Sequence, residues 1–117
     1  MQMVMNRSEV MKQCIDDCVD CYMTCAETMA HCLSMGGEHA EAKHITIMDD
    51  CAKACNISTD YMLRNSDLDA HMCSLCAQAC ENCADSCEKF EEDFMKQCAE
   101  TCRKCADSCN KMAAEQK

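Results

Sequence analysis

The spacing of cysteine along this chain constrains its fold more than any other feature. Within each of several runs, successive cysteines are separated by steps that alternate between three and four residues, and the longest such run holds Cys73, Cys76, Cys80, Cys83 and Cys87. This alternation gives a mean period of 3.5 residues, the period of inward-facing positions on a helix that packs against other helices. The chain is therefore expected to line the buried seams of packed helices with thiols.

Four cysteine runs predict four helices, and we expect them at about residues 7–35, 38–64, 67–89 and 93–114. The first helix is expected to follow Asn6, because Asn6 and Glu9 fit a capping box, and to end at the glycines 36 and 37. Ser66 with Asp69 resembles a cap for the third helix. A turn is expected at residues 90–94, although this segment holds no Gly or Pro, since an unbroken helix would leave half of its seam uncovered.

The length of 117 residues fits a single domain, residues 1–117, and the four helices predict an all-α fold, an antiparallel four-helix bundle with a cysteine-lined core. Only thirteen residues are Val, Ile, Leu or Phe, so cysteine is expected to fill the core. When the seams are extended in the same phase, they take in Met11, Thr28, Met35, His44, Met48, Ser58, Met62, Met95 and Met112. His31, His39 and His71 fall off the seams and are expected in solvent or at helix ends.

Charge and composition exclude two classes of partner. The net charge of −10 argues against nucleic acid and anionic membranes, and two Tyr, two Phe and no Trp leave almost no surface on which bases could stack. No apolar stretch approaches the roughly 20 residues of a membrane span, and the start at Met1 carries no secretion signal. A cytoplasmic protein is therefore expected, in a compartment that keeps thiols reduced.

Sixteen inward thiols could act as small hydrophobes, form disulfides or bind metal. Hydrophobic packing explains a few buried cysteines but not a seam built mainly of them. Neighbouring cysteines on one helix have Cβ atoms ~5–6 Å apart, too far for an unstrained disulfide. Metal binding is the favoured interpretation, and it assigns no catalytic role to any residue.

Ligand softness and charge select among the metals. Thiolates suit Zn(II), iron–sulfur clusters and Cu(I), but the spacing is helical and lacks the proline-ended loop of a bacterial ferredoxin. Four Zn(II) ions shared among sixteen thiolates would leave eight negative charges in the core (16 − 8 = 8), whereas exchanging each thiol proton for one Cu(I) ion leaves the charge unchanged. Multiple Cu(I) ions per chain are therefore predicted. The predicted ligands are Cys14, Cys18, Cys21, Cys25, Cys32, Cys51, Cys55, Cys73, Cys76, Cys80, Cys83, Cys87, Cys98, Cys102, Cys105 and Cys109, together with His44 and Met48.

The chain resembles the bacterial copper storage proteins, four-helix bundles whose cores hold cysteine-bound Cu(I). The resemblance rests on the Cys-x3-Cys-x2-Cys-x3-Cys patterns that start at Cys14, Cys76 and Cys98, and on Cys51-x3-Cys55. It implies cytosolic copper storage, a tetramer of bundles, and His or Met ligands near the open end of the bundle. Two alternatives stay open: a thiol redox or iron–sulfur protein, and a zinc-binding, metallothionein-like protein.

Two further expectations concern the surface and the ends. A second apolar stripe on the first helix either covers a neighbouring helix or faces another protomer, and it favours a homo-oligomer; its residues are Ile15, Val19, Tyr22, Ala26, Met29 and Leu33. In an up-down-up-down bundle, Met35, His44, Met48 and Met95 gather at one end, which is predicted to admit copper.

Overall fold

The described part of the chain forms four long helices and one short one. The computed structural model describes residues 7–115. Its elements are α1 (Glu9–Met35), the 3-10 helix η1 (Gly37–Ala40), α2 (Ala42–Leu63), α3 (Asp69–Cys87) and α4 (Asp93–Ala114). The described residues contain no strand, and the all-α prediction is confirmed.

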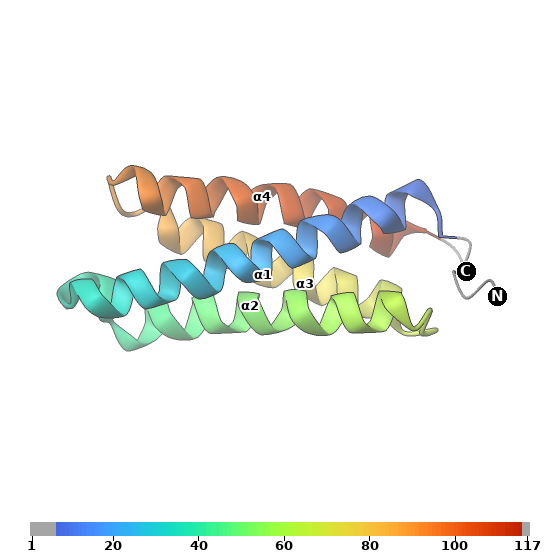
Figure 1. The fold of residues 1–117 in the computed structure, drawn as a ribbon, viewed down its shortest axis with the longest axis horizontal. Coiled ribbons are helices and arrows are strands. Elements are labelled where there is room, and N and C mark those ends of the chain that lie inside the picture. Colours follow the sequence, from blue (N-terminus) through green and yellow to red (C-terminus); the bar gives the residue numbers. More distant parts are fainter. Residues whose placement is uncertain (1–6, 116–117) are drawn as a thin grey trace.

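The helices form an antiparallel bundle in which each packs against the next along the chain, and α4 packs against α1 to close the ring (Figure 1). The α1–α2 and α3–α4 connections lie at one end, and the α2–α3 connection lies at the other end with the two chain ends (Figure 1). Short connections between antiparallel neighbours produce this topology. Among residues 7–115 no helix combines the length and the apolar character needed to cross a membrane.

The first helix begins later than predicted. Asn6 lies outside the described residues, and the observed N-cap is Ser8, whose Oγ accepts a hydrogen bond of 3.0 Å from the backbone N–H of Met11. At the other end, Gly36 and Gly37 have φ angles of 71° and 56°, values that glycine adopts without steric cost. The Gly36 N–H reaches the Cys32 carbonyl and closes the helix.

The two connections without glycine have different causes. Ser66 Oγ accepts a hydrogen bond of 3.1 Å from the Leu68 N–H, so the predicted capping residue supports the turn while α3 itself starts at Asp69. Between α3 and α4 the chain breaks at residues 88–92, as predicted. There Phe90 is half-buried, and its ring contacts the imidazoles of His39 and His44, with centroid separations of 4.2 and 5.0 Å. Burial of this ring favours a turn here, although no Gly or Pro marks a turn in the sequence.

The core is made of thiols. All sixteen cysteines are fully buried, and small alanines such as Ala84 and Ala106 pack beside them. The extended seams are buried as expected with one exception: Met35 is 53% exposed at the end of α1, so its predicted core position is wrong. The largest fully buried side chains are four methionines: Met48, Met62, Met95 and Met112.

Polar contacts tie the helices together at their margins. Asp17 of α1 is buried and accepts hydrogen bonds from Ser108 of α4 and from Gln13. Arg103 of α4 binds carboxylates of α3 and of the residue that follows it. Its guanidinium lies 2.7–2.8 Å from the carboxylate oxygens of Glu81, Asp85 and Glu88. These polar contacts join α4 to α1 and to α3 around the thiol core, and none of them involves a cysteine.

Candidate metal centre

The cysteine sulfur atoms form an almost continuous chain of contacts along the bundle axis. Neighbouring Sγ atoms, on the same helix or across helices, are separated by 3.6–4.0 Å. These distances exceed the ~2.05 Å of a disulfide bond and leave room for an ion between sulfurs.

Several sulfurs group tightly enough to surround one ion. In each group the ligand atoms all lie within 4.8 Å of one another. Among these groups, four contain four cysteines and one contains three. Their members are Cys18, Cys76, Cys105 and Cys109; Cys21, Cys55, Cys80 and Cys105; Cys21, Cys25, Cys51 and Cys102; Cys25, Cys83, Cys98 and Cys102; and Cys14, Cys73 and Cys109. Five cysteines belong to two groups each: Cys21, Cys25, Cys102, Cys105 and Cys109. Neighbouring candidate sites therefore share ligands, as sites joined by bridging thiolates do.

Cys25 illustrates how the fold brings these thiols together. Its Sγ lies 3.9 Å from that of Cys21 on the same helix, 3.7 Å from Cys51 of α2, 4.0 Å from Cys83 of α3 and 3.6 Å from Cys102 of α4. A single sulfur therefore contacts sulfurs from all four helices. Such a core follows directly from placing cysteine at seam positions on all four helices of an antiparallel bundle.

Crowding couples the ionisation of these thiols. The side-chain contact between Cys21 and Cys102 lowers the pKa of Cys21 and raises the pKa of Cys102 well above its ordinary value. In such a pair, one thiolate is stabilised by a neighbour that keeps its proton, because two thiolates in contact would repel each other. Complete deprotonation requires that cations replace the protons, one positive charge for each.

At the end that holds the α1–α2 and α3–α4 connections, the ligand set changes character. The Cys32 Sγ lies 3.4 Å from His44 Nε2 and 3.6 Å from the Met95 sulfur. Burial raises the pKa of Cys32 to about 11, and burial lowers the pKa of His44, so a neutral imidazole faces a protonated thiol. We call Cys32, His44 and Met95 the inner end set; it offers one thiol, one imidazole and one thioether.

Two members of this set, Cys32 and His44, are predicted ligands. His44 is 6% exposed and aims Nε2 at Cys32, while Met48, one turn further along α2, is fully buried. Met95 was placed on its seam but not among the ligands. Ser86 was missed: its Oγ lies 2.7 Å from His44 Nδ1 and orients the ring, and no spacing in α3 could have signalled this cross-helix contact.

Two of the cavities on the described surface differ in the side chains that they reach. One, of about 160 Å³, reaches His44, Ser86 and Phe90 from outside, beside Glu38 and Glu41.

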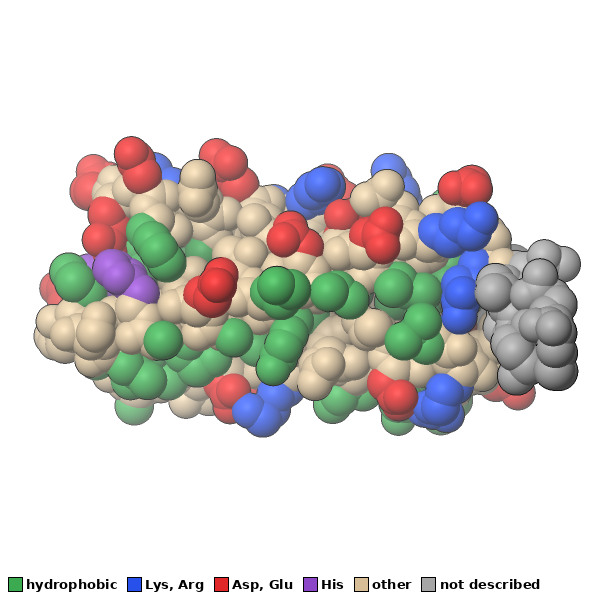
Figure 2. All heavy atoms as spheres, in the orientation of Figure 1, with side chains coloured by type: hydrophobic (Ala, Val, Ile, Leu, Met, Phe, Trp, Pro, Cys, Tyr) green, Lys and Arg blue, Asp and Glu red, His purple; other side chains and the backbone are tan. Residues whose placement is uncertain are grey.

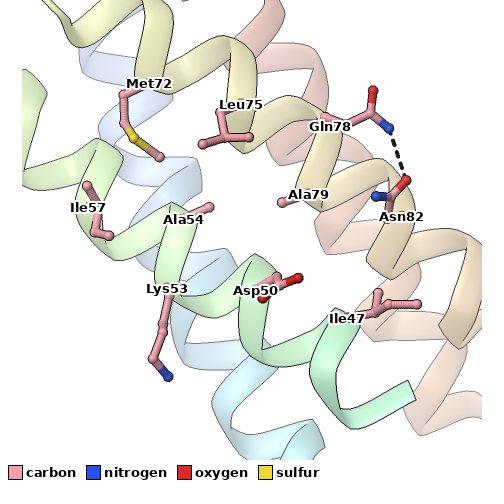
Figure 3. Close-up of a pocket in the computed structure, with 10 residues that line it drawn as sticks. All are labelled: Ile47, Asp50, Lys53, Ala54, Ile57, Met72, Leu75, Gln78, Ala79 and Asn82. Carbon is pink, nitrogen blue, oxygen red and sulfur yellow. Dashed lines mark hydrogen bonds between the residues drawn. The ribbon is translucent and has the colours of Figure 1, made fainter. Parts of the chain in front are cut away.

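The other cavity, of about 320 Å³, is an open groove along the outside of α2 and α3 (Figure 3). Ile47, Ala54, Ile57, Met72 and Leu75 contribute its apolar lining, and no cysteine reaches it. The first cavity reaches the predicted ligand His44, and the second reaches none of the predicted ligands.

Comparisons with known proteins agree with this geometry. A family model described as "Copper storage protein" matches residues 7–114. A solved structure of the Nmul_A1745 protein from Nitrosospira multiformis superposes with a TM-score of 0.86 at 44% identity, covering 91% of this chain and 96% of that one. The Cu(I)-bound copper storage protein BsCsp3 gives 0.85 at 32% identity, covering 91% and 100% of the two chains.

A sequence relative is also similar. The chain is 34% identical over 80 residues to the "Uncharacterized cysteine-rich protein YhjQ" of Bacillus subtilis, which covers 68% of this chain and 74% of that protein. The apo form of copper storage protein 3 from the same organism superposes with a TM-score of 0.79 at 34% identity, covering 88% of this chain and 98% of that one.

Proposed function

Because this chain belongs to the copper storage protein family, we propose that it stores many Cu(I) ions on the cysteine thiolates of its core. The observation that carries the proposal is the connected set of buried sulfurs, in which each group of three or four shares members with the next. Soft thiolates that bridge between sites suit Cu(I), which accepts low coordination numbers. The role is storage, with no catalytic step assigned to any residue.

Charge neutrality sets the expected chemistry of loading. Each Cu(I) that binds should release about one proton, because it replaces a thiol proton in a core that carries no compensating cation among the described residues. Zn(II) brings two charges and prefers four ligands of its own, so far fewer Zn(II) ions should fit. Proton release during anaerobic loading, measured in a pH-stat beside the bound copper, tests this. Release near zero, or equal capacity for both metals, would contradict it.

We propose that all sixteen cysteines serve as ligands, and that His44 and Met48 join them at the end that admits copper. The support is the change from thiols alone to an imidazole and thioethers at that end, and the cavity that reaches His44. Neutral donors bind Cu(I) without releasing a proton and hold it less tightly than thiolate, which suits transfer inward.

A double variant tests the position of the entrance. Replacing both His44→Leu and Met48→Leu should slow Cu(I) uptake and its removal by a chelator, while capacity changes by only about one or two ions. The matched control is Met62→Leu with Met112→Leu at the opposite end, which should leave both rates unchanged. Equal rates in wild type and the first variant would place the entrance elsewhere.

We further propose that the protein is cytoplasmic and assembles as a homotetramer. Two exposed apolar surfaces support assembly: the stripe on α1 that includes Val19, Tyr22 and Leu33, and the groove along α2 and α3. Figure 2 shows hydrophobic side chains gathered in a band over α1 and α2. A tetramer with dihedral symmetry needs at least two different contact surfaces, and this chain offers two.

A further inference from the structure

Outside the cysteine core, two histidines and a glutamate converge on one point. His31 Nε2 lies 3.3 Å from Glu92 Oε1, and His39 Nε2 contacts the same oxygen. The three residues come from α1, from η1 and from the residue that precedes α4. Figure 2 shows histidine side chains at the corresponding end of the molecule. We call His31, His39 and Glu92 the outer cluster.

Aromatic rings hold the outer cluster in place. Phe94 stacks on the His31 ring with a centroid separation of 4.5 Å, and Phe90 packs on the His39 ring at 4.2 Å. The side chains of His31, His39 and Glu92 are 24%, 17% and 34% exposed, so the donors are positioned by packing and remain open to solvent. Donor atoms fixed by packing are what a metal site needs.

The outer cluster differs from the inner end set in chemistry. Phe90 contacts both His39 and His44, so its ring lies between the two sets. The inner set offers sulfur, nitrogen and sulfur, whereas the outer cluster offers two imidazole nitrogens and a carboxylate oxygen. The first donor set suits Cu(I); the second suits a borderline divalent cation such as Zn(II).

We propose that the outer cluster binds one Zn(II) ion through His31 Nε2, His39 Nε2 and Glu92, with a fourth position open to water. Two ligands in a tetrahedral Zn(II) site, each about 2.0 Å from the ion, lie about 3.3 Å apart. The His31–Glu92 separation is already 3.3 Å. The His39–Glu92 hydrogen bond must open for the ion to enter between them.

Bound Zn(II) has a mechanical consequence, which rests on the proposed copper entrance at this end. The ion joins α1, η1 and the residue that precedes α4. Cys32 lies on α1, His44 lies on α2, which follows η1, and Met95 lies on α4, so the joined segments carry or directly precede the inner end set. An ion held by all three resists their separation. Zn(II) binding therefore slows the passage of Cu(I) to and from the core.

The binding test uses protein whose thiols are already occupied. Anaerobically Cu(I)-loaded protein is equilibrated with Zn(II) by dialysis, and both metals are counted in the same samples. The wild type should retain one Zn(II) per chain, and His39→Gln and Glu92→Gln should each lose it. His71→Gln, which changes an exposed histidine of α3 outside the cluster, should retain it. A wild type that retains no Zn(II), or cluster variants that retain it fully, would overturn the site.

A kinetic test addresses the consequence separately. Cu(I) transfer to a Cu(I)-selective chelator is followed with and without one equivalent of Zn(II). Zn(II) should slow transfer several-fold in the wild type and leave the His39→Gln rate unchanged. An unaltered wild-type rate with Zn(II) bound would overturn the coupling. Because the copper count is read in every sample, loss of copper storage itself would be seen as a low count and not mistaken for loss of the zinc site.

Discussion

Met62 offers a direct test of what holds the metal-free bundle together. It is fully buried near the C-terminal end of α2, and it is among the largest fully buried side chains in a core otherwise built mainly of cysteine and alanine. A Met→Ala change in a core costs about 2–5 kcal/mol, part of which reflects the cavity that remains. Short cysteine and alanine side chains cannot extend to fill that cavity, so we expect about 3–5 kcal/mol for Met62→Ala.

This loss is large beside the total stability of a small domain, which is about 5–15 kcal/mol. At about 4 °C per kcal/mol for a chain of this size, the melting temperature of the reduced apo protein should fall by roughly 12–20 °C. Urea unfolding followed by circular dichroism gives the free energy. Copper capacity should not change, since Met62 lies at the opposite end of the bundle from the inner end set.

The matched control is Met23→Ala, which removes the same atoms from a position on α1 that is 55% exposed. Exposed substitutions usually change stability by less than about 0.5 kcal/mol. If Met62→Ala lost no more stability than Met23→Ala, the idea that a few methionines carry the apo core would be refuted.

Three further predictions follow from the same structure. Cys25→Ala should lower Cu(I) capacity by about one or two ions, because it removes a sulfur that contacts sulfurs of all four helices. The stability of the apo protein should change by only about 1 kcal/mol. Unchanged capacity would contradict a core in which sites share ligands. Val19→Glu combined with Tyr22→Lys should dissociate the oligomer in light scattering while sparing copper capacity, and a monomeric wild type at micromolar concentration would rule the oligomer out. Cu(I) loading should raise the melting temperature because the ions bind only the folded bundle, so coincident melting curves with and without copper would count against storage in the core.

The cysteine seams made the architecture predictable. Residues at a period of 3.5 must face inward in a bundle, and each seam position from Met11 to Met112 except Met35 is buried accordingly. Met35 is exposed because it is the last residue of α1, where the chain turns at the glycine pair. A periodic rule holds only within the length of the packed helices.

Polar contacts between side chains outside the cysteine seams were not predictable. Ser86 pairs with His44 across helices, and Glu92 joins two histidines that had been expected in solvent or at helix ends. No spacing encodes these contacts, because they depend on how two connections fold over one end of the bundle. The N-cap of the first helix is Ser8 and not the predicted Asn6. The Ser8 side chain accepts a hydrogen bond from the Met11 N–H in the first turn of α1.

Storage in the thiol core requires that the amount of bound copper follow the number of cysteine sulfurs. The test is an anaerobic titration of reduced, metal-free protein with Cu(I) against a competing chelator. The bound copper is counted per chain. The core of sixteen buried cysteines predicts saturation at about one Cu(I) per cysteine. Saturation at four ions or fewer would contradict storage and leave an ordinary structural metal site.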